Sequence, residues 1–222
     1  MQQSGPAKQS RLWLLNPILV VVSLVGCSDV SPGISTPTPI TVSTAMHSCP
    51  PEGEISVSTY YVYYEITGST PDELRIQMDQ LGHTDETGHH WDAYTKWNVS
   101  WSYPYSTTAH GCVTGPITVE AKVTFVFPQW DDPEKAPEDL VEQWNAYLAT
   151  LQRHEDGHRD IAIAAGCEIL RALDSLSAYA SCGELEQTAD VIAGSILEYY
   201  RQREDTYDLE TGHGATQGVH FP

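Results

Sequence analysis

Residues 140–173, LVEQWNAYLATLQRHEDGHRDIAIAAGCEILRAL, have the apolar period of one long helix. Their apolar side chains recur at steps of three and four residues, and the pattern extends over about residues 137–177. Two histidines, His154 and His158, fall on the apolar stripe, and Glu155 directly follows the first of them. We therefore predict a helix that turns both histidines toward the core of the protein.

The spacing of the two histidines suits a zinc ion. Residues four apart on a helix share one face, with Cβ atoms about 5–6 Å apart, so both imidazoles can reach one metal at about 2.0–2.1 Å. Glu155 is turned by about 100° from His154, so it can take a proton from zinc-bound water without binding the metal. This is the HExxH pattern of zincins, with His154 and His158 as ligands and Glu155 as the general base. The alternative is a pair of core histidines hydrogen-bonded to a neighbouring sheet.

A catalytic zinc also needs a third protein ligand and an open coordination position. The metzincin pattern is excluded, because it requires glycine and histidine where the chain has Ile161 and Ala164. The following helix offers four carboxylates, and spacing singles out none of them: Glu184, Glu186, Asp190 and Glu198. The other candidate is His213, in the tail segment TGHG, which could fold closely around a metal. Tyr207 is a candidate hydrogen-bond donor to the oxyanion of a tetrahedral intermediate, although packing alone is the commoner role of a tail tyrosine.

The segments before residue 130 have the features of strands and one short helix. Thr70, Pro71 and Glu73 have the pattern of a capping box at the start of that helix. From alternation and β-branched or aromatic content we predict strands over residues 55–67, 93–103 and 119–127, and from apolar period helices over 71–81, 137–177 and 184–205. Strands followed by helices predict an α+β domain, with an antiparallel sheet packed against the long helix and a second C-terminal helix, as in zincins.

Two further groups of residues have both a functional and a structural interpretation. A polar loop is predicted over residues 82–90, and it contains His83, His89 and His90. A solvated loop is favoured there over a second metal site. A predicted strand aligns the aromatic residues Trp97, Trp101 and Tyr103 on one face. That spacing favours sheet core over a carbohydrate cleft.

The N-terminal region has the pattern of a bacterial lipoprotein signal. Residues 1–26 hold two basic residues and then a short, interrupted apolar run, and LVGC at residues 24–27 resembles a lipobox. We predict cleavage before Cys27, a lipid on its sulfur, a flexible Ser/Thr/Pro tether over 27–48 and a folded domain over 49–222.

Charge and cysteine content restrict the partners and the compartment. The chain has 30 acidic residues against 11 basic ones, a formal net charge of −19, so nucleic acid is excluded as a partner and the acids are expected to form a solvated surface. Four cysteines follow Cys27, namely Cys49, Cys112, Cys167 and Cys182. An even number in an exported chain predicts two disulfides. The pairing stays open. The sequence allows Cys167–Cys182 together with Cys49–Cys112, and it equally allows Cys112–Cys182.

Five blocks of the sequence resemble a bacterial family, domain of unknown function 922. The blocks are YYEITGSTPDELRIQM, HHWDAYTKWNVSWSY, FVFPQW, RHEDGHRDIA and YDLETGHGATQGVHFP, and together they span roughly residues 60–222. Members of this family are described as predicted secreted zinc-dependent proteases. The resemblance implies a zincin-like domain whose helical motif corresponds to His154, Glu155 and His158. Its recurrent tail corresponds to the segment around His213, which we therefore predict as the third zinc ligand.

These features together predict a lipid-anchored zinc metallopeptidase of the bacterial cell envelope, on the periplasmic face of the outer membrane. The expected cofactor is Zn²⁺, and the expected partners are a peptide or protein substrate and the membrane, through the lipid on Cys27. An edge strand beside the helix is expected to hold an extended peptide by strand addition. The alternatives are a cell-wall peptide amidase with the same chemistry and a non-catalytic envelope lipoprotein that zinc stabilises.

Overall fold

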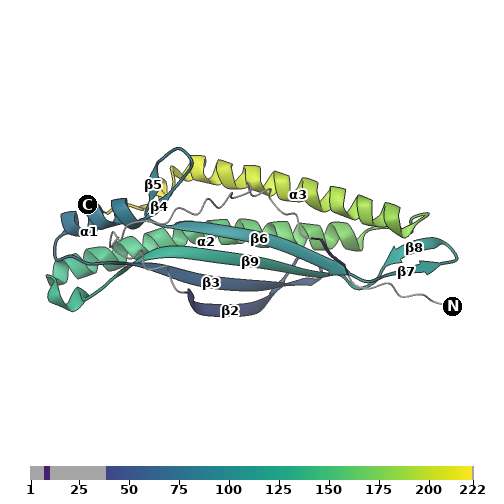
Figure 1. The fold of residues 1–222 in the computed structure, drawn as a ribbon, viewed down its shortest axis with the longest axis horizontal. Coiled ribbons are helices and arrows are strands. Elements are labelled where there is room, and N and C mark those ends of the chain that lie inside the picture. Colours follow the sequence, from purple (N-terminus) through teal and green to yellow (C-terminus); the bar gives the residue numbers. More distant parts are fainter. Residues whose placement is uncertain (1–7, 11–38, 222) are drawn as a thin grey trace, which may run out of the picture.

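The structure is a computed structural model that describes residues 8–10 and 39–221. The predicted signal segment, apart from residues 8–10, and the predicted lipidation site Cys27 lie outside the described residues. The described chain forms an elongated α+β domain, in which a five-stranded sheet lies along one long helix and a second long helix runs beside the first (Figure 1). This confirms the predicted α+β class, with the sheet in the N-terminal half and two long helices in the C-terminal half.

The sheet has the strand order β1-β6-β9-β3-β2. Its strands are β1 (Lys8–Ser10), β2 (Pro39–Ser48), β3 (Glu54–Ile66), β6 (Tyr94–Tyr103) and β9 (Thr118–Trp130). The alternation of β9 buries every second side chain, including Val123 and Phe125, on the face that meets the long helix. All neighbours pair antiparallel except β3 and β9, which are parallel, with Tyr61 opposite Phe125. That pair departs from the prediction because a long crossover separates the two strands, as parallel pairing requires.

Three helices accompany the sheet: α1 (Pro71–Leu81), α2 (Glu138–Asp174) and α3 (Cys182–Thr211). The Thr70 side chain caps α1 by accepting from the Glu73 amide, and Glu73 in turn accepts from the amide of Ser69 instead of that of Thr70. Single 3-10 turns precede α2 and follow α3, namely η1 (Pro133–Lys135) and η2 (Ala215–Gln217). The helix α2 lies against the sheet, and α3 packs along α2 (Figure 1).

The core has two apolar clusters along α2. One surrounds Phe125 and Trp144, and the other surrounds Val99 and Leu173. The buried stripe of α2 is interrupted near its middle by three polar side chains, which are those of His154, Glu155 and His158. Since burying unpaired polar groups costs free energy, these three side chains need polar or ionic partners nearby.

Several elements differ from the sequence-based expectations. Residues 39–48 of the predicted tether form β2, whose residues 42–48 are all exposed. Its Ser, Thr and Pro content is typical of linkers, which is why a tether was predicted there. The predicted loop over residues 82–90 is largely a hairpin of β4 (His83–Thr84) and β5 (His90–Trp91). A second small hairpin pairs β7 (Tyr105–Thr108) with β8 (Gly111–Thr114). Strands of two to four residues are too short for a period to be recognised.

The C-terminal helix is six residues longer at its end than predicted, since α3 reaches Thr211 instead of residue 205. The segment after residue 205 is rich in glycine and has no apolar period, so the pattern indicated no further helical turn. The helix in fact stops at Gly212, whose φ of 55° is the left-handed conformation that glycine adopts at a helix end. Asp208 therefore lies on the last turns of a helix.

Two disulfides join the strands and hairpins to the helices. Cys49 pairs with Cys167 and Cys112 pairs with Cys182, with Cα atoms 5.4 Å and 5.0 Å apart. Both predicted bridges exist, and the pairing that the sequence left open is resolved. Disulfides persist in oxidising compartments, so this pair indicates an extracytoplasmic location.

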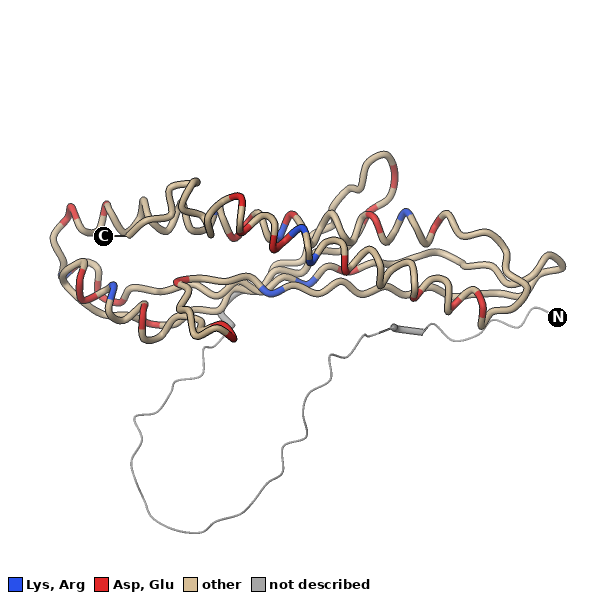
Figure 2. The backbone as a smooth tube through the Cα atoms, turned by 90° about the horizontal axis from the view of Figure 1, so that it is seen from above, with Lys and Arg blue, Asp and Glu red and all other residues tan. Residues whose placement is uncertain are grey.

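Within residues 8–10 and 39–221, none of the helices has the length and apolar character needed to cross a membrane. Acidic residues are spread along the helices and loops instead of gathering in one patch (Figure 2). This distribution agrees with the expected solvated acidic surface.

Candidate metal centre

Three side chains from the two long helices converge near the middle of α2. His154 and His158 come from α2, and Asp208 comes from α3. The Oδ1 atom of Asp208 lies 3.4 Å from Nε2 of His154 and 3.1 Å from Nε2 of His158. The three ligand atoms lie within 4.8 Å of one another, so these residues form a group that can hold a metal ion.

The second nitrogen of each imidazole lies close to an acceptor oxygen. Nδ1 of His154 lies 3.1 Å from Oε1 of Gln217 in η2. Nδ1 of His158 lies 3.2 Å from Oε1 of Glu204, which also accepts from Nε1 of Trp97 at 2.9 Å. With a proton on each Nδ1, both Nε2 lone pairs are directed at the same point. Metal-binding histidines in proteins are held by this kind of outer acceptor.

The donor set fits a cation. Oδ1 of Asp208 is buried, and among the described residues its contacts with the two Nε2 atoms do not have hydrogen-bond geometry, although carboxylate oxygens in protein interiors are almost always satisfied. Two imidazole nitrogens and one carboxylate are a common ligand set for catalytic zinc, which keeps a further position open for water or substrate.

The charges of the group are mutually stabilised. Burial raises the pKa of Asp208, but the adjacent imidazoles of His154 and His158 outweigh burial and hold the pKa well below its usual range. Burial likewise lowers the pKa of His158, but Asp208 and Glu204 outweigh it and raise the pKa to about 10. A protonated His158 thus balances the carboxylates around it. A metal cation would take over this role and displace that proton.

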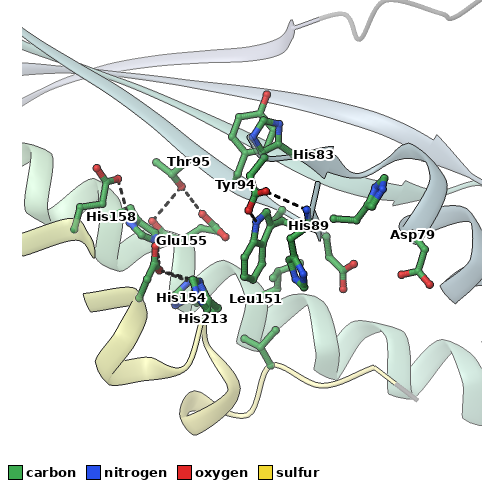
Figure 3. A pocket seen from close by; sticks show the side chains of 18 of the residues that line it. Asp79, His83, His89, Tyr94, Thr95, Leu151, His154, Glu155, His158 and His213 are labelled. Carbon is green, nitrogen blue, oxygen red and sulfur yellow. Dashed lines mark hydrogen bonds and ion pairs between the residues drawn. The ribbon is translucent and has the colours of Figure 1, made fainter. Parts of the chain in front are cut away.

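Glu155 lies beside the metal-binding group and not within it. Its side chain is almost fully buried and accepts a hydrogen bond of 2.6 Å from Oγ1 of Thr95 in β6 (Figure 3). Burial raises the pKa of Glu155 above its usual value, although the bond from Thr95 and the charge of His158 lower it. A raised pKa brings a carboxylate closer to the range in which it exchanges protons near neutral pH.

Tyr207 supports the group from behind instead of facing the pocket. Its hydroxyl donates to the backbone carbonyl of His154 at 3.0 Å, and its ring stacks on that of His154 with centroids 5.2 Å apart. The contact is possible because α2 has glycine at position 157, where a Cβ atom would lie 2.2 Å from Oη of Tyr207. The hydroxyl is therefore engaged in positioning His154, and it does not take the oxyanion-binding position considered from the sequence.

We expect Gly157→Ala to destabilise the protein by about 1–3 kcal/mol, because the added methyl group would displace Tyr207. The matched control is Gly194→Ala on α3, where no atom lies within 4 Å of the added Cβ. In the control, alanine should stabilise the helix by about 0.5–1 kcal/mol. Urea denaturation of both variants measures the difference, and equal effects would contradict the assigned contact.

His213 lies at the rim of the group. Its Nδ1 is 3.8 Å from Oδ1 of Asp208, its side chain is 44% exposed and its ring stacks on Trp91 with centroids 4.1 Å apart. Its backbone φ of 52° places it in the left-handed turn after α3. The role of His213 as third ligand thus stays a prediction, while the structure brings Asp208 closer to both histidines. None of the carboxylates named from the sequence, Glu184, Glu186, Asp190 and Glu198, belongs to the group.

One signal in the sequence points to the carboxylates that were missed. Glu204 and Asp208 are four residues apart, the same spacing as His154 and His158. On two packed helices such pairs place two residues of each helix on facing surfaces. This spacing can be recognised as a helical pair only if the second helix is predicted to continue beyond residue 205.

The group opens into a cavity of about 580 Å³. Its walls include Glu155, the three residues of the group and the hairpin of β4 and β5, so His83, His89 and His90 line the same cavity (Figure 3). Among the described residues these hairpin histidines form no metal-binding group of their own. The predicted solvated loop is instead part of the wall of the cavity.

Comparison with known proteins identifies a family. A family model described as "Bacterial protein of unknown function (DUF922)" matches residues 61–214, a range that contains Glu155, His213 and all three residues of the metal-binding group. No curated protein and no solved structure matches the chain. Because the match covers most of the sequence, the chain belongs to this bacterial family of unknown function, DUF922.

Proposed function

We propose that the protein is a zinc-dependent peptidase, attached to the bacterial cell envelope by a lipid on Cys27. The observation that supports this most strongly is the convergence of His154, His158 and Asp208 beside the buried carboxylate of Glu155, at the wall of an open cavity. The two disulfides agree with an envelope location.

His154, His158 and Asp208 would hold the zinc, which when bound supplies a Lewis acid and lowers the pKa of water. Glu204 and Gln217 keep the two imidazoles in the orientation that binding needs. Glu155 takes the proton from the attacking water and passes it to the leaving amine. Thr95 holds Glu155 in place through its hydrogen bond.

The edge of β6 supports an extended peptide as the substrate. Among the described strands, β1 pairs only with residues 101–103 of β6, so the segment Tyr94–Ser100 has a free edge on the side away from β9. A groove between β6 and α3 continues from the cavity, since Thr95 and Glu204 line both. An extended peptide added to this edge would run past Glu155 and the metal-binding group.

Hydrolysis of a peptide library by the full chain tests this function. We expect cleavage that a chelator stops and that added zinc restores, because the metal is needed for the reaction. Cleavage that continues after the metal has been removed would contradict a metallopeptidase. No cleavage of any peptide by the zinc-loaded chain would favour the non-catalytic alternative.

We expect Glu204→Gln to weaken zinc binding by about 10-fold to 100-fold, the range typical of outer partners of metal-binding histidines. The substitution removes the negative charge beside Nδ1 of His158 and leaves the size of the side chain unchanged. The matched control is Glu198→Gln on the exposed face of the same helix, which should bind zinc as the unmodified chain does. Competition with a chelator of known affinity measures both, and an unchanged affinity in Glu204→Gln would exclude its role.

A further inference from the structure

One wall of the cavity is built from two sets of rings in tilted contact. The rings of His83 and Tyr94 have centroids 4.0 Å apart. The ring of Trp91 contacts those of His89 and His213, with its centroid 4.1 Å from each of theirs. We call these five residues the ring wall, and all of them line the cavity.

The ring wall adjoins the metal-binding group. His213 belongs to the wall, and its Nδ1 is 3.8 Å from Oδ1 of Asp208. Leu151 lines the cavity one turn before Glu155 on α2, and Val219 of the tail lines it as well. If the peptide bond to be cleaved lies at the metal-binding group, the side chain of an adjacent substrate residue would therefore contact the ring wall, Leu151 and Val219.

The hairpin that holds Trp91 is fixed by one carboxylate. Oδ1 of Asp85 accepts from the amide and hydroxyl of Thr87 and from the amide of His89, at distances of 2.7–3.0 Å. Its Oδ2 accepts from Nε1 of Trp91 at 2.9 Å. These bonds orient the indole before any ligand arrives, so its placement costs no ordering when a side chain binds.

The charged groups around the ring wall are already paired. Arg75 donates to Asp92 and lies 2.9 Å from Asp79, and Tyr147 also donates to Asp92. Asp85 accepts hydrogen bonds from Thr87, His89 and Trp91 of the hairpin. Burial and the charge of Lys96 lower the pKa of His83, which favours its neutral form. Asp79, Asp85 and Asp92 are thus engaged by other groups of the protein. Lys96 lies over the ring of Tyr94, 5.1 Å from its centroid, and does not line the cavity.

We propose that the ring wall is a subsite that selects an aromatic side chain of the substrate, at the residue next to the cleaved bond. The inference rests on the proposed peptidase function and names the side chain that this site takes. Rings attract rings in offset or edge-to-face arrangements, and burying an aromatic side chain removes a large apolar area from water.

Binding of four peptide hydroxamates to the zinc-loaded full chain tests the subsite without measuring turnover. The compounds share a backbone and a metal-binding hydroxamate, and they differ only in a benzyl, isobutyl, methyl or carboxyethyl side chain. Calorimetry should give the tightest binding for benzyl, at least tenfold tighter than for methyl, and the weakest binding for carboxyethyl. Equal affinities for benzyl and methyl, or preference for carboxyethyl, would overturn the subsite.

Trp91→Ala should reduce the preference for benzyl over methyl to about threefold or less, while zinc content stays the same. Tyr199→Ala removes an exposed ring of α3 that does not line the cavity, and it should leave the preference unchanged. Because Trp91→Ala can disturb the hairpin, His89→Ala provides a second variant, with the same direction of change expected. If Trp91→Ala and His89→Ala both kept the full preference for benzyl over methyl, the inference would be overturned. Failure of all four hydroxamates to bind the zinc-loaded chain would instead overturn the proposed function.

Discussion

Glu155→Gln is expected to abolish peptide hydrolysis while the protein keeps its metal. The amide has the shape of the carboxylate and still accepts the hydrogen bond from Thr95, but it cannot take a proton from water. Loss of a positioned general base lowers rates by about 10²-fold to 10⁴-fold. The zinc content should not change, because Glu155 lies outside the group of His154, His158 and Asp208.

The measurement compares kcat/KM and zinc content of the variant with those of the unmodified chain. Glu142→Gln is the matched control, since Glu142 is an exposed glutamate on the same helix and lies away from the cavity. The control should retain full activity and full metal content. If Glu155→Gln hydrolysed the peptide at an undiminished rate, Glu155 would not be the general base, even if the protein binds zinc.

Loss of the Cys49–Cys167 disulfide should cause the largest fall in stability. The bridge joins residues 118 apart in sequence. Closing a loop of this length lowers the entropy of the unfolded chain, which raises its free energy by about 5 kcal/mol at room temperature. It ties the turn between β2 and β3 to the C-terminal half of α2. The double variant Cys49→Ala, Cys167→Ala avoids a free thiol and isolates the effect of the bond.

Guanidinium denaturation of this double variant measures the change in the free energy of unfolding. The comparison is Cys112→Ala, Cys182→Ala, which opens a loop of 70 residues and should cost about 4 kcal/mol. The two bridges should therefore have similar effects, with the longer loop slightly larger. A loss below about 1 kcal/mol in the first variant would show that this bridge does not hold the two halves of the domain together.

Long elements could be predicted because their apolar period is repeated many times. The stripe of α2 extends over more than thirty residues and the alternation of β9 over about ten, and both agree with the structure. The position of His154 and His158 on the buried face followed directly from this period. The parallel pairing of β3 with β9 could not be predicted, since strand alternation contains no information on direction.

Asp208 was missed because its role depends on where two helices pack. Its own helix was expected to end at residue 205, so the four-residue spacing between Glu204 and Asp208 was not recognised as a pair on one helix face. The same reason explains the ring wall, whose members come from β4, β5, β6 and the turn after α3. Stacking between Trp91 and His213 joins residues more than 100 apart in sequence, which is a tertiary contact without a local signature.

The metal centre is the central claim, and zinc content per chain tests it most directly. The full chain and two variants would be loaded with zinc, dialysed and analysed by atomic emission, with protein quantified from amino-acid analysis. Asp208 binds the metal in our account and His213 lies at the rim, so the unmodified chain and His213→Ala should each hold about one zinc and Asp208→Ala almost none. A chain that holds no zinc, or full zinc in Asp208→Ala together with its loss in His213→Ala, would contradict the account.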